Sequence, residues 1–259
     1  MRILRLAAVA AVALTAISGA EAKDWTKVRM GTEGAYPPFN YTTADGTLTG
    51  FDVEIGNALC DELKLECTWV TQDWDGIIPG LIAGKYDTIL ASMSITPERM
   101  EKISFSKKYY NTPPGIAVRK DSELSEATTE GLEGVRLGAQ GSTTHSQFAE
   151  EILSGSDIAL YPTSEEYKLD LENGRVDAVV DDVMVLTEWV NSDQGSCCKI
   201  LGTMQSIDRI HGEGAGIGVR QGDEDLAALF TKGIAALRAN GKYKEINDKY
   251  FTFDVYGGE

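Results

Sequence analysis

Short apolar runs alternate with segments of helical periodicity along most of the chain. Residues 51–63 are typical, because Phe51, Ile55, Leu59 and Leu63 recur every four positions and would form one apolar face of a helix. We expect further helices at residues 76–84, 142–153, 164–172, 182–190, 225–239 and 243–250. Between them we expect strands at residues 27–31, 67–71, 86–93, 116–119, 135–139, 157–161, 177–181 and 216–220.

This repeated alternation predicts an α/β fold whose sheets are mostly parallel and flanked by helices. There are more elements than one five-stranded unit needs, so we expect two such lobes. Two segments are typical of crossings between lobes: residues 110–115, which contain Thr112-Pro113-Pro114, and residues 207–216, which contain three glycines. A chain that crosses twice places residues 23–111 and 214–259 in lobe 1, and residues 112–213, with the hinge segments, in lobe 2.

The first 22 residues have the three parts of a secretory signal peptide. Arg2 and Arg5 form a basic start, residues 6–17 are an apolar run, and Ala20-Glu21-Ala22 is an A-x-A cleavage site. The run is too short to span a bilayer, which takes ~20 apolar residues. A buried N-terminal helix is the rival interpretation. We expect cleavage after Ala22 and an exported protein that is not embedded in a membrane.

Composition and charge exclude several other classes. The chain is 42% hydrophobic and 25% charged, which is typical of a globular protein. The net charge of 24 − 40 = −16 argues against a nucleic-acid partner. The two histidines, His145 and His211, leave few options for a His-rich metal site, and we expect no metal and no cofactor.

Export makes disulfides available to the four cysteines, which form two close pairs. Four cysteines allow three pairings, and the sequence does not choose among them. Closeness favours Cys60–Cys67. A bridge between the adjacent Cys197 and Cys198 stays open, although it would be strained. Metal binding is disfavoured because the chain has no C-x-x-C pair.

Ligands of open α/β sheets bind beyond the carboxyl ends of the strands, and polar and aromatic side chains follow most of the predicted strands. Arg99 can clamp a carboxylate with two parallel hydrogen bonds, and a carboxylate such as Asp182 can accept an ammonium group. The free N–H groups of a helix that begins near Ser142 and Thr143 attract anions. This set suits an amino-acid zwitterion.

The same residues also have ordinary structural interpretations. Arg99 could make a surface ion pair, and Tyr36 and Trp74 could be core aromatics. Asp52 could cap a helix, as could Thr143.

Six segments, in order, carry a resemblance to one family. They are residues 33–39 (EGAYPPF), 50–56 (GFDVEIG), 69–79 (WVTQDWDGIIP), 92–99 (SMSITPER), 141–143 (GST) and 249–257 (KYFTFDVYG). The chain resembles the periplasmic amino-acid-binding proteins of polar amino-acid ABC importers, which are solute-binding proteins of family 3. Within that family it is most similar to the lysine/arginine/ornithine and histidine binders.

The resemblance implies a clamshell of two lobes that closes on a cationic L-amino acid in the periplasm and docks transiently on a membrane ABC permease. It implies a binding protein rather than an enzyme, and we expect a monomer. Arg99 would hold the α-carboxylate with help from Ser92 and the region of Ser142 and Thr143. Asp182 and the hydroxyl group of Ser94 would hold the α-ammonium group.

The resemblance also assigns the side-chain end of the ligand. Tyr36 and Trp74 would sandwich it, and Glu33 and Asp52 would read its distal positive charge. The family's lysine/arginine/ornithine and histidine branch also implies the Cys60–Cys67 disulfide. Trp74 offers a wide face for a planar guanidinium, which favours arginine over lysine.

This chain departs from the family pattern at several positions. Glu33 stands where Asp is usual, and Ala91 stands where Ser is usual, so one hydroxyl contact near the ammonium group is missing. Ala139 and Thr144 replace larger residues. These changes leave room for a bulkier opine, which is one alternative ligand. A periplasmic dehydratase on the same fold is the other alternative, with Glu33 as its acid or base.

Overall fold

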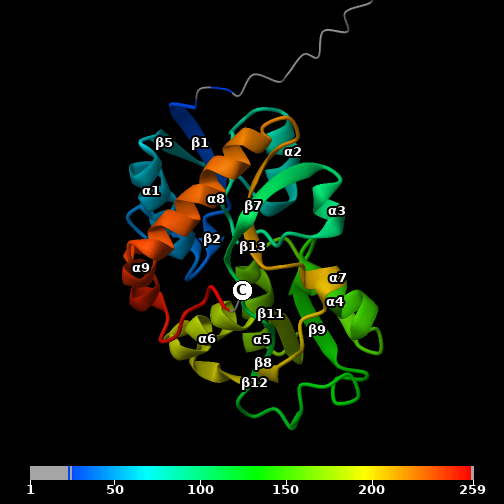
Figure 1. Cartoon of the computed structure of the whole chain (residues 1–259). Coiled ribbons are helices and arrows are strands. Elements are labelled where there is room, and N and C mark those ends of the chain that lie inside the picture. The colour runs from blue at the N-terminus through cyan, green and yellow to red at the C-terminus, as the bar shows by residue number, and fades with distance from the viewer. Residues whose placement is uncertain (1–22, 24, 258–259) are drawn as a thin grey trace, which may run out of the picture.

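The computed structural model describes residues 23 and 25–257, and Figure 1 shows them as two lobes, one above the other. The predicted signal peptide, residues 1–22, lies outside the described residues. None of the helices in the described part of the chain is long and apolar enough to cross a membrane.

The upper lobe is built on a five-stranded sheet with the order β5-β1-β6-β13-β7. Its strands are β1 (Lys27–Thr32), β5 (Glu66–Thr71), β6 (Thr88–Ile89), β7 (Ile103–Tyr110) and β13 (Ala215–Arg220). Its helices are α1 (Phe51–Leu63), α2 (Ile77–Ile82), α3 (Pro97–Met100), α8 (Glu224–Ala239) and α9 (Lys242–Tyr250), with the 3₁₀ turn η1 (Trp74–Gly76). A small antiparallel sheet joins β2 (Ala35–Tyr36), β3 (Asn40–Thr42) and β4 (Leu48–Thr49).

The lower lobe repeats this plan with the order β10-β9-β11-β8-β12. Its strands are β8 (Pro114–Arg119), β9 (Arg136–Gln140), β10 (Asp157–Tyr161), β11 (Ala178–Asp182) and β12 (Cys198–Thr203). Its helices are α4 (Thr144–Ile152), α5 (Ser164–Glu172), α6 (Val183–Asn191) and α7 (Asp208–His211), with the 3₁₀ turn η2 (Gln194–Cys197). The central strands β8 and β11 are buried on both faces, which explains their continuous apolar runs.

Each sheet is less parallel than the alternation of strands and helices suggests. β1 pairs in parallel with β5 and β6, and β9 pairs in parallel with β10 and β11. The other two pairings of each sheet are antiparallel. The reason is the double crossing: the chain enters the lower lobe between β7 and β8 and returns between β12 and β13, and those strands fill the antiparallel positions. The lobe limits, 23–111 with 214–259 and 112–213, stay a prediction.

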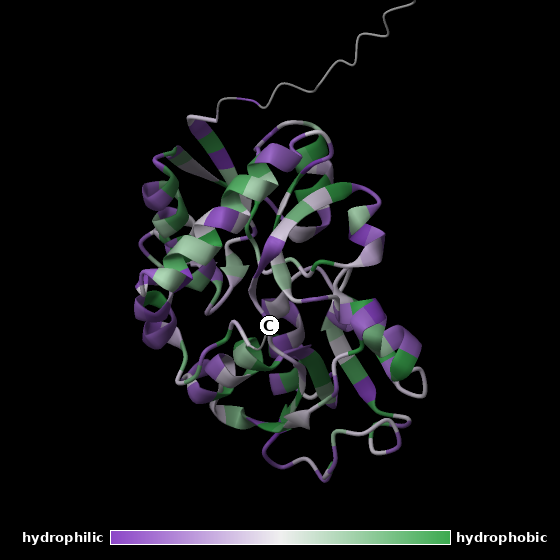
Figure 2. Cartoon of the chain, in the orientation of Figure 1, coloured by the Kyte–Doolittle hydropathy of each residue, from purple (hydrophilic) through white to green (hydrophobic). Residues whose placement is uncertain are grey.

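Each lobe has its own apolar core under its helices, and Figure 2 shows hydrophobic and hydrophilic residues alternating along these helices. In the upper lobe Phe51 packs edge-on against Phe251, with ring centroids 5.2 Å apart. Phe39 stacks on Tyr110 with centroids 4.5 Å apart. This aromatic cluster joins α1, the hinge strand β7 and the C-terminal segment, so it fixes the chain next to the crossing.

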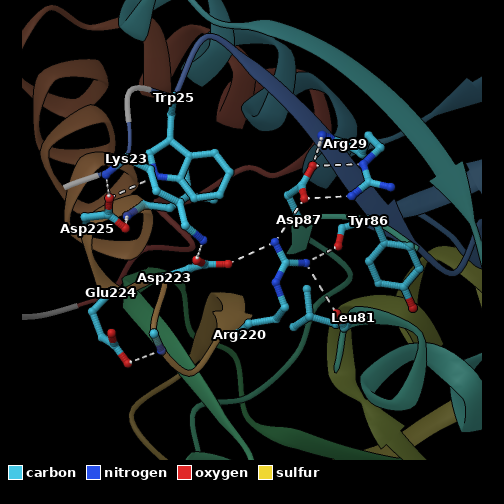
Figure 3. A network of polar contacts seen from close by, with 12 residues as sticks. Lys23, Trp25, Arg29, Leu81, Tyr86, Asp87, Arg220, Asp223, Glu224 and Asp225 are labelled. Carbon is cyan, nitrogen blue, oxygen red and sulfur yellow. Dashed lines mark hydrogen bonds and ion pairs between the residues drawn. The ribbon is translucent and has the colours of Figure 1, made fainter. Parts of the chain in front are cut away.

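A chain of ion pairs ties the start of β1 to the start of α8 (Figure 3). Asp87 accepts hydrogen bonds from Arg29 (Nη2 to Oδ1, 2.8 Å) and from Arg220 (3.0 Å). Arg220 also pairs with Asp223, and Asp223 in turn pairs with Lys23. Burial works to raise the pKa of Asp87, but the hydrogen bonds from Arg29 and Arg220 outweigh it and hold this pKa at about 2.

Both cysteine pairs are disulfides. Cys60 at the end of α1 bonds to Cys67 in β5, as expected, and ties the helix to the sheet edge. Cys197 and Cys198 form the adjacent bridge at the start of β12, the pairing that stayed open from the sequence. In the described part of the chain, no group of three or more His, Cys, Asp or Glu side chains is placed to hold a metal ion.

Candidate ligand-binding site

A cavity lies between the lobes, next to the two crossings. Nine of the predicted ligand residues line it: Glu33, Tyr36, Trp74, Ala91, Ser92, Ser94, Arg99, Thr143 and Asp182. Residues of the crossings, Asn111, Thr112, Gly214 and Ala215, also line it, as do Tyr110, Gln140, Thr144, His145 and His211. The lining therefore comes from both lobes and the hinge, so its shape depends on how far the lobes are closed.

Arg99 supplies a positive charge to the cavity lining. It lies in the short helix α3, where the Thr96 side chain caps its backbone N–H (3.3 Å). Its guanidinium donates to the carbonyl of Ser94 (3.0 Å) and lies 5.3 Å from the centre of the Trp74 ring. No carboxylate of the described residues pairs with it, and burial lowers its pKa to about 10. A buried guanidinium without a counter-ion is ready to accept an anionic group.

Helix α4 begins beside Arg99. Thr143 is its N-cap: the Thr143 hydroxyl accepts from the backbone N–H of Ser146 (3.0 Å) and donates to the carbonyl of Gln140 (2.7 Å). This hydroxyl is therefore already engaged. What remains for an anion is the positive end of the helix, where the first backbone N–H groups have no partner inside the helix.

Asp182 supplies the negative group near the hinge. It ends β11 and caps α6, where its side chain accepts from the backbone N–H of Met184 (2.8 Å) and from the hydroxyl of Thr112. It is 5% exposed, and burial raises its pKa to about 7 despite these hydrogen bonds. A bound ammonium group would reverse that shift by keeping the carboxylate ionised.

Two aromatic side chains, Tyr36 of β2 and Trp74 of η1, form walls of the cavity. Tyr36 is buried and donates its hydroxyl hydrogen to Asp181 of the other lobe. Trp74 donates from Nε1 to the backbone carbonyl of Ser142 (3.0 Å), again across the lobes. Both side chains therefore line the cavity and also hold the lobes together, a second role that the sequence did not reveal.

Glu33 lines the cavity in a negative environment. Burial, in spite of a hydrogen bond from Gln140, raises its pKa to about 7, and the nearby carboxylates of Asp181, Asp73 and Asp75 add to the shift. Gln140 Nε2 donates to Glu33 Oε1 at 2.7 Å. Gln140 was not predicted as a site residue, although its position at the end of β9 could have pointed to it.

Asp52 has a different setting from most of the other predicted ligand residues. It does not line the cavity; it is fully buried and accepts hydrogen bonds from Tyr109 (2.8 Å), Asn40 (2.9 Å) and Ser92 Oγ (3.0 Å). Its direct contact with a ligand, which the resemblance implied, stays a prediction. The capping alternative is wrong, because Gly50 is the N-cap of α1. Asp52 instead supports the turn that presents Ser92.

Ser142 is also placed differently from the expectation. It does not line the inner cavity but a larger outer one, which shares Trp74 and Arg99 with it. Ser92 (φ 54°) and Ser142 (φ 59°) both adopt the left-handed conformation, which is strained for residues other than glycine. Such strain is concentrated at functional turns, and here one strained serine comes from each lobe.

Two histidines were not expected in the site. His145 and His211 line the cavity with ring centroids 5.9 Å apart, and burial lowers the pKa of both, that of His211 to about 4. His145 Nε2 lies 3.4 Å from Asp181 Oδ1. His211 Nδ1 accepts from the backbone N–H of Ile207 (3.0 Å). At neutral pH this wall of the cavity is therefore uncharged.

Comparisons with known proteins agree with this geometry. Residues 28–253 match the family described as bacterial extracellular solute-binding proteins, family 3. The chain is 44% identical over 256 residues to the L-arginine-binding protein of Pseudomonas aeruginosa, with 98% of each chain covered. It is 36% identical to the octopine-binding periplasmic protein of Rhizobium meliloti, covering 97% of this chain and 99% of that one.

A solved structure carries the same fold. An ancestral arginine-binding protein bound to arginine superposes on this chain with a TM-score of 0.80 at 32% identity, covering 87% of this chain and 98% of that one. The match extends over both lobes, so the family model, the sequence relatives and the fold agree. The resemblance carried by the six sequence segments is confirmed: the chain belongs to the bacterial extracellular solute-binding proteins of family 3.

Proposed function

We propose that this protein is the solute-binding component of an ABC importer and that it captures a cationic L-amino acid, arginine foremost. The observation that carries the proposal is the combination of charged side chains that line the cavity. Arg99, a partly buried cation that pairs with no carboxylate of the described residues, and Asp182, a buried carboxylate, suit the two charges of an α-amino acid. A second carboxyl, Glu33, suits a positive group on its side chain.

Lobe closure couples this recognition to transport. Hydrogen bonds between described residues join the lobes: Tyr36 to Asp181, Gln140 to Glu33, Trp74 to Ser142, and Ser164 to Ala35. A ligand held by Arg99 in one lobe and Asp182 in the other adds contacts that exist only when the lobes are closed. It thereby shifts the population towards the closed form, which the permease would recognise.

We further propose that the protein works as a monomer in the periplasm after removal of residues 1–22, and that it binds without turnover. The P. aeruginosa relative, an L-arginine-binding protein, supports the ligand class. The octopine-binding relative keeps an opine as a second candidate, and Ala91 and Thr144 line the cavity where extra room was expected. Ala139 gives no such room, because it is fully buried in the lower core.

A thermal-shift screen of ligand-stripped protein tests the proposal. The panel contains the twenty L-amino acids with ornithine, citrulline, octopine and nopaline. A ligand at 100 times its Kd stabilises the folded state by about 2.7 kcal/mol, or roughly 5–10 °C for a protein of this size. We expect the largest shift with arginine. Shifts of the melting temperature with the opines alone would identify the ligand as an opine. No shift with any compound would contradict the proposal of an amino-acid-binding protein.

A further inference from the structure

Gln140 has an unusual position between the lobes. It is the last residue of β9 and only 3% of its surface is exposed. Its side-chain nitrogen donates two hydrogen bonds, one to Glu33 Oε1 in the other lobe (2.7 Å) and one to the carbonyl of Pro162 (3.1 Å). Because the amide nitrogen has two acceptors, the orientation of the amide is determined: its oxygen, Oε1, must be at the opposite corner.

Two side-chain oxygens of residues that line the cavity have no hydrogen-bond partner among the described residues. Gln140 Oε1 accepts no hydrogen bond from the described residues, and neither does the second oxygen of Glu33. Both side chains line the same cavity and are joined through Oε1 of Glu33. Neither oxygen is among the fully buried unpartnered atoms of the described residues, and both residues line the cavity, so these two oxygens are suited to receive donors from a ligand.

We propose that Gln140 is a specificity-determining residue, whose side-chain oxygen and the free oxygen of Glu33 accept two N–H groups of a guanidinium and thereby select arginine over lysine and ornithine. This rests on the proposed function, because it concerns the distal end of the same ligand. A guanidinium is planar and presents parallel N–H donors in a rigid fork. An ammonium group is a compact, strongly hydrated point charge that pairs with Glu33 but gains less from a neutral second acceptor.

The charges around Glu33 support this division of roles. Asp181, Asp73 and Asp75 act on Glu33 together and make this end of the cavity negative. A negative field attracts every cation and does not distinguish one from another. The neutral, oriented amide of Gln140 does distinguish them, because its contribution to the binding free energy depends on the number and direction of the ligand's N–H donors.

The test compares arginine and lysine affinities of the full mature protein and of Gln140→Leu by calorimetry. Gln205→Leu is the matched control, since Gln205 is exposed and lies outside the cavity. Leucine also removes the hydrogen bond that joins the lobes, which weakens every ligand alike. The ratio of the two Kd values cancels that loss of closure and isolates recognition. If Gln140→Leu does not fold, Gln140→Met replaces it.

We expect arginine to lose at least about tenfold more affinity than lysine in Gln140→Leu, with both ligands unchanged in Gln205→Leu. A ratio that stays within about twofold of the wild-type ratio would overturn the role of Gln140 in selection. A wild-type protein that prefers lysine would overturn it as well, and would leave the proposed function intact. A wild-type protein that binds neither ligand would instead overturn the proposed function.

Discussion

Replacing Glu33 by Gln tests how the cavity reads the charge on the ligand side chain. The informative ligands are arginine and citrulline, which differ mainly by a charged guanidinium and a neutral urea group. When the lobes close around arginine, Glu33 is paired and stays ionised. When they close around citrulline, Glu33 is buried without a counter-ion, the situation in which its pKa is about 7.

The raised pKa predicts opposite pH behaviour for the two ligands. In the open form Glu33 has an ordinary pKa of about 4.3, so closing on citrulline takes up a proton below pH 7. The closed complex is therefore favoured at low pH and loses that advantage as the pH rises through 7. The shift from about 4.3 to about 7 makes citrulline affinity roughly tenfold higher at pH 6 than at pH 8. Arginine affinity stays flat over this range.

Glu33→Gln removes both effects. Arginine should lose about 2–4 kcal/mol of binding free energy, roughly 30- to 1,000-fold in Kd, because its buried guanidinium loses a charged partner. Citrulline should change little at pH 6 and should lose its pH dependence. Calorimetry at pH 6, 7 and 8 measures both, with the exposed Glu66→Gln as the control. Equal losses for the two ligands, or a citrulline affinity that is flat in the wild type, would refute the reasoning.

Three further changes follow from other contacts. Arg99→Ala should weaken arginine binding by about 100-fold or more, because the α-carboxylate loses its only buried guanidinium partner among the described residues; wild-type affinity by calorimetry would contradict this. Trp74→Phe removes the 3.0 Å hydrogen bond to Ser142 that joins the lobes, so stopped-flow measurements should show ligand dissociation up to ~10-fold faster. An unchanged dissociation rate would mean that this hydrogen bond does not stabilise the closed form. Asp87→Asn should lower the free energy of unfolding at pH 7 by about 1–2 kcal/mol. The pKa of Asp87 is about 2 in the folded state and about 3.9 in the unfolded state, so this difference should disappear in urea titrations as the pH falls through 2. A loss of stability that persists at that pH would not be electrostatic.

Elements with strong periodicity were predictable from the sequence. α1 (Phe51–Leu63) and α5 (Ser164–Glu172) have the predicted bounds, because α1 shows an apolar stripe and α5 is followed by the helix-ending pair Asn173-Gly174. The strands of the small sheet were missed because two or three residues have no detectable period. For residues 86–93 the predicted strand was too long. Only Thr88–Ile89 is a strand, and the remaining apolar positions are buried without belonging to it.

The site was predictable to the extent that chemistry depends on residue type. Arg99 could be expected to meet a carboxylate because guanidinium groups at strand ends are suited to that task. Partners far apart in the chain were not predictable. Glu33 and Gln140 are 107 residues apart, and Tyr36 and Asp181 are 145 apart. No local pattern indicates that such pairs meet, since they come from different lobes.

The adjacent pair Asp181 and Asp182 shows where sequence reasoning ends. The family resemblance favoured Asp182 as the ligand residue and left Asp181 undecided, and successive residues of a strand point to opposite faces. The strand register selects Asp182 for the cavity, next to Thr112 of the crossing. Asp181 instead accepts from Tyr36 of the upper lobe and Tyr167 of the lower one. A shift of one residue would exchange the carboxylate that lines the cavity with the one that joins the lobes. The two aspartates therefore differ in position only through the pairing of β11 with its neighbours.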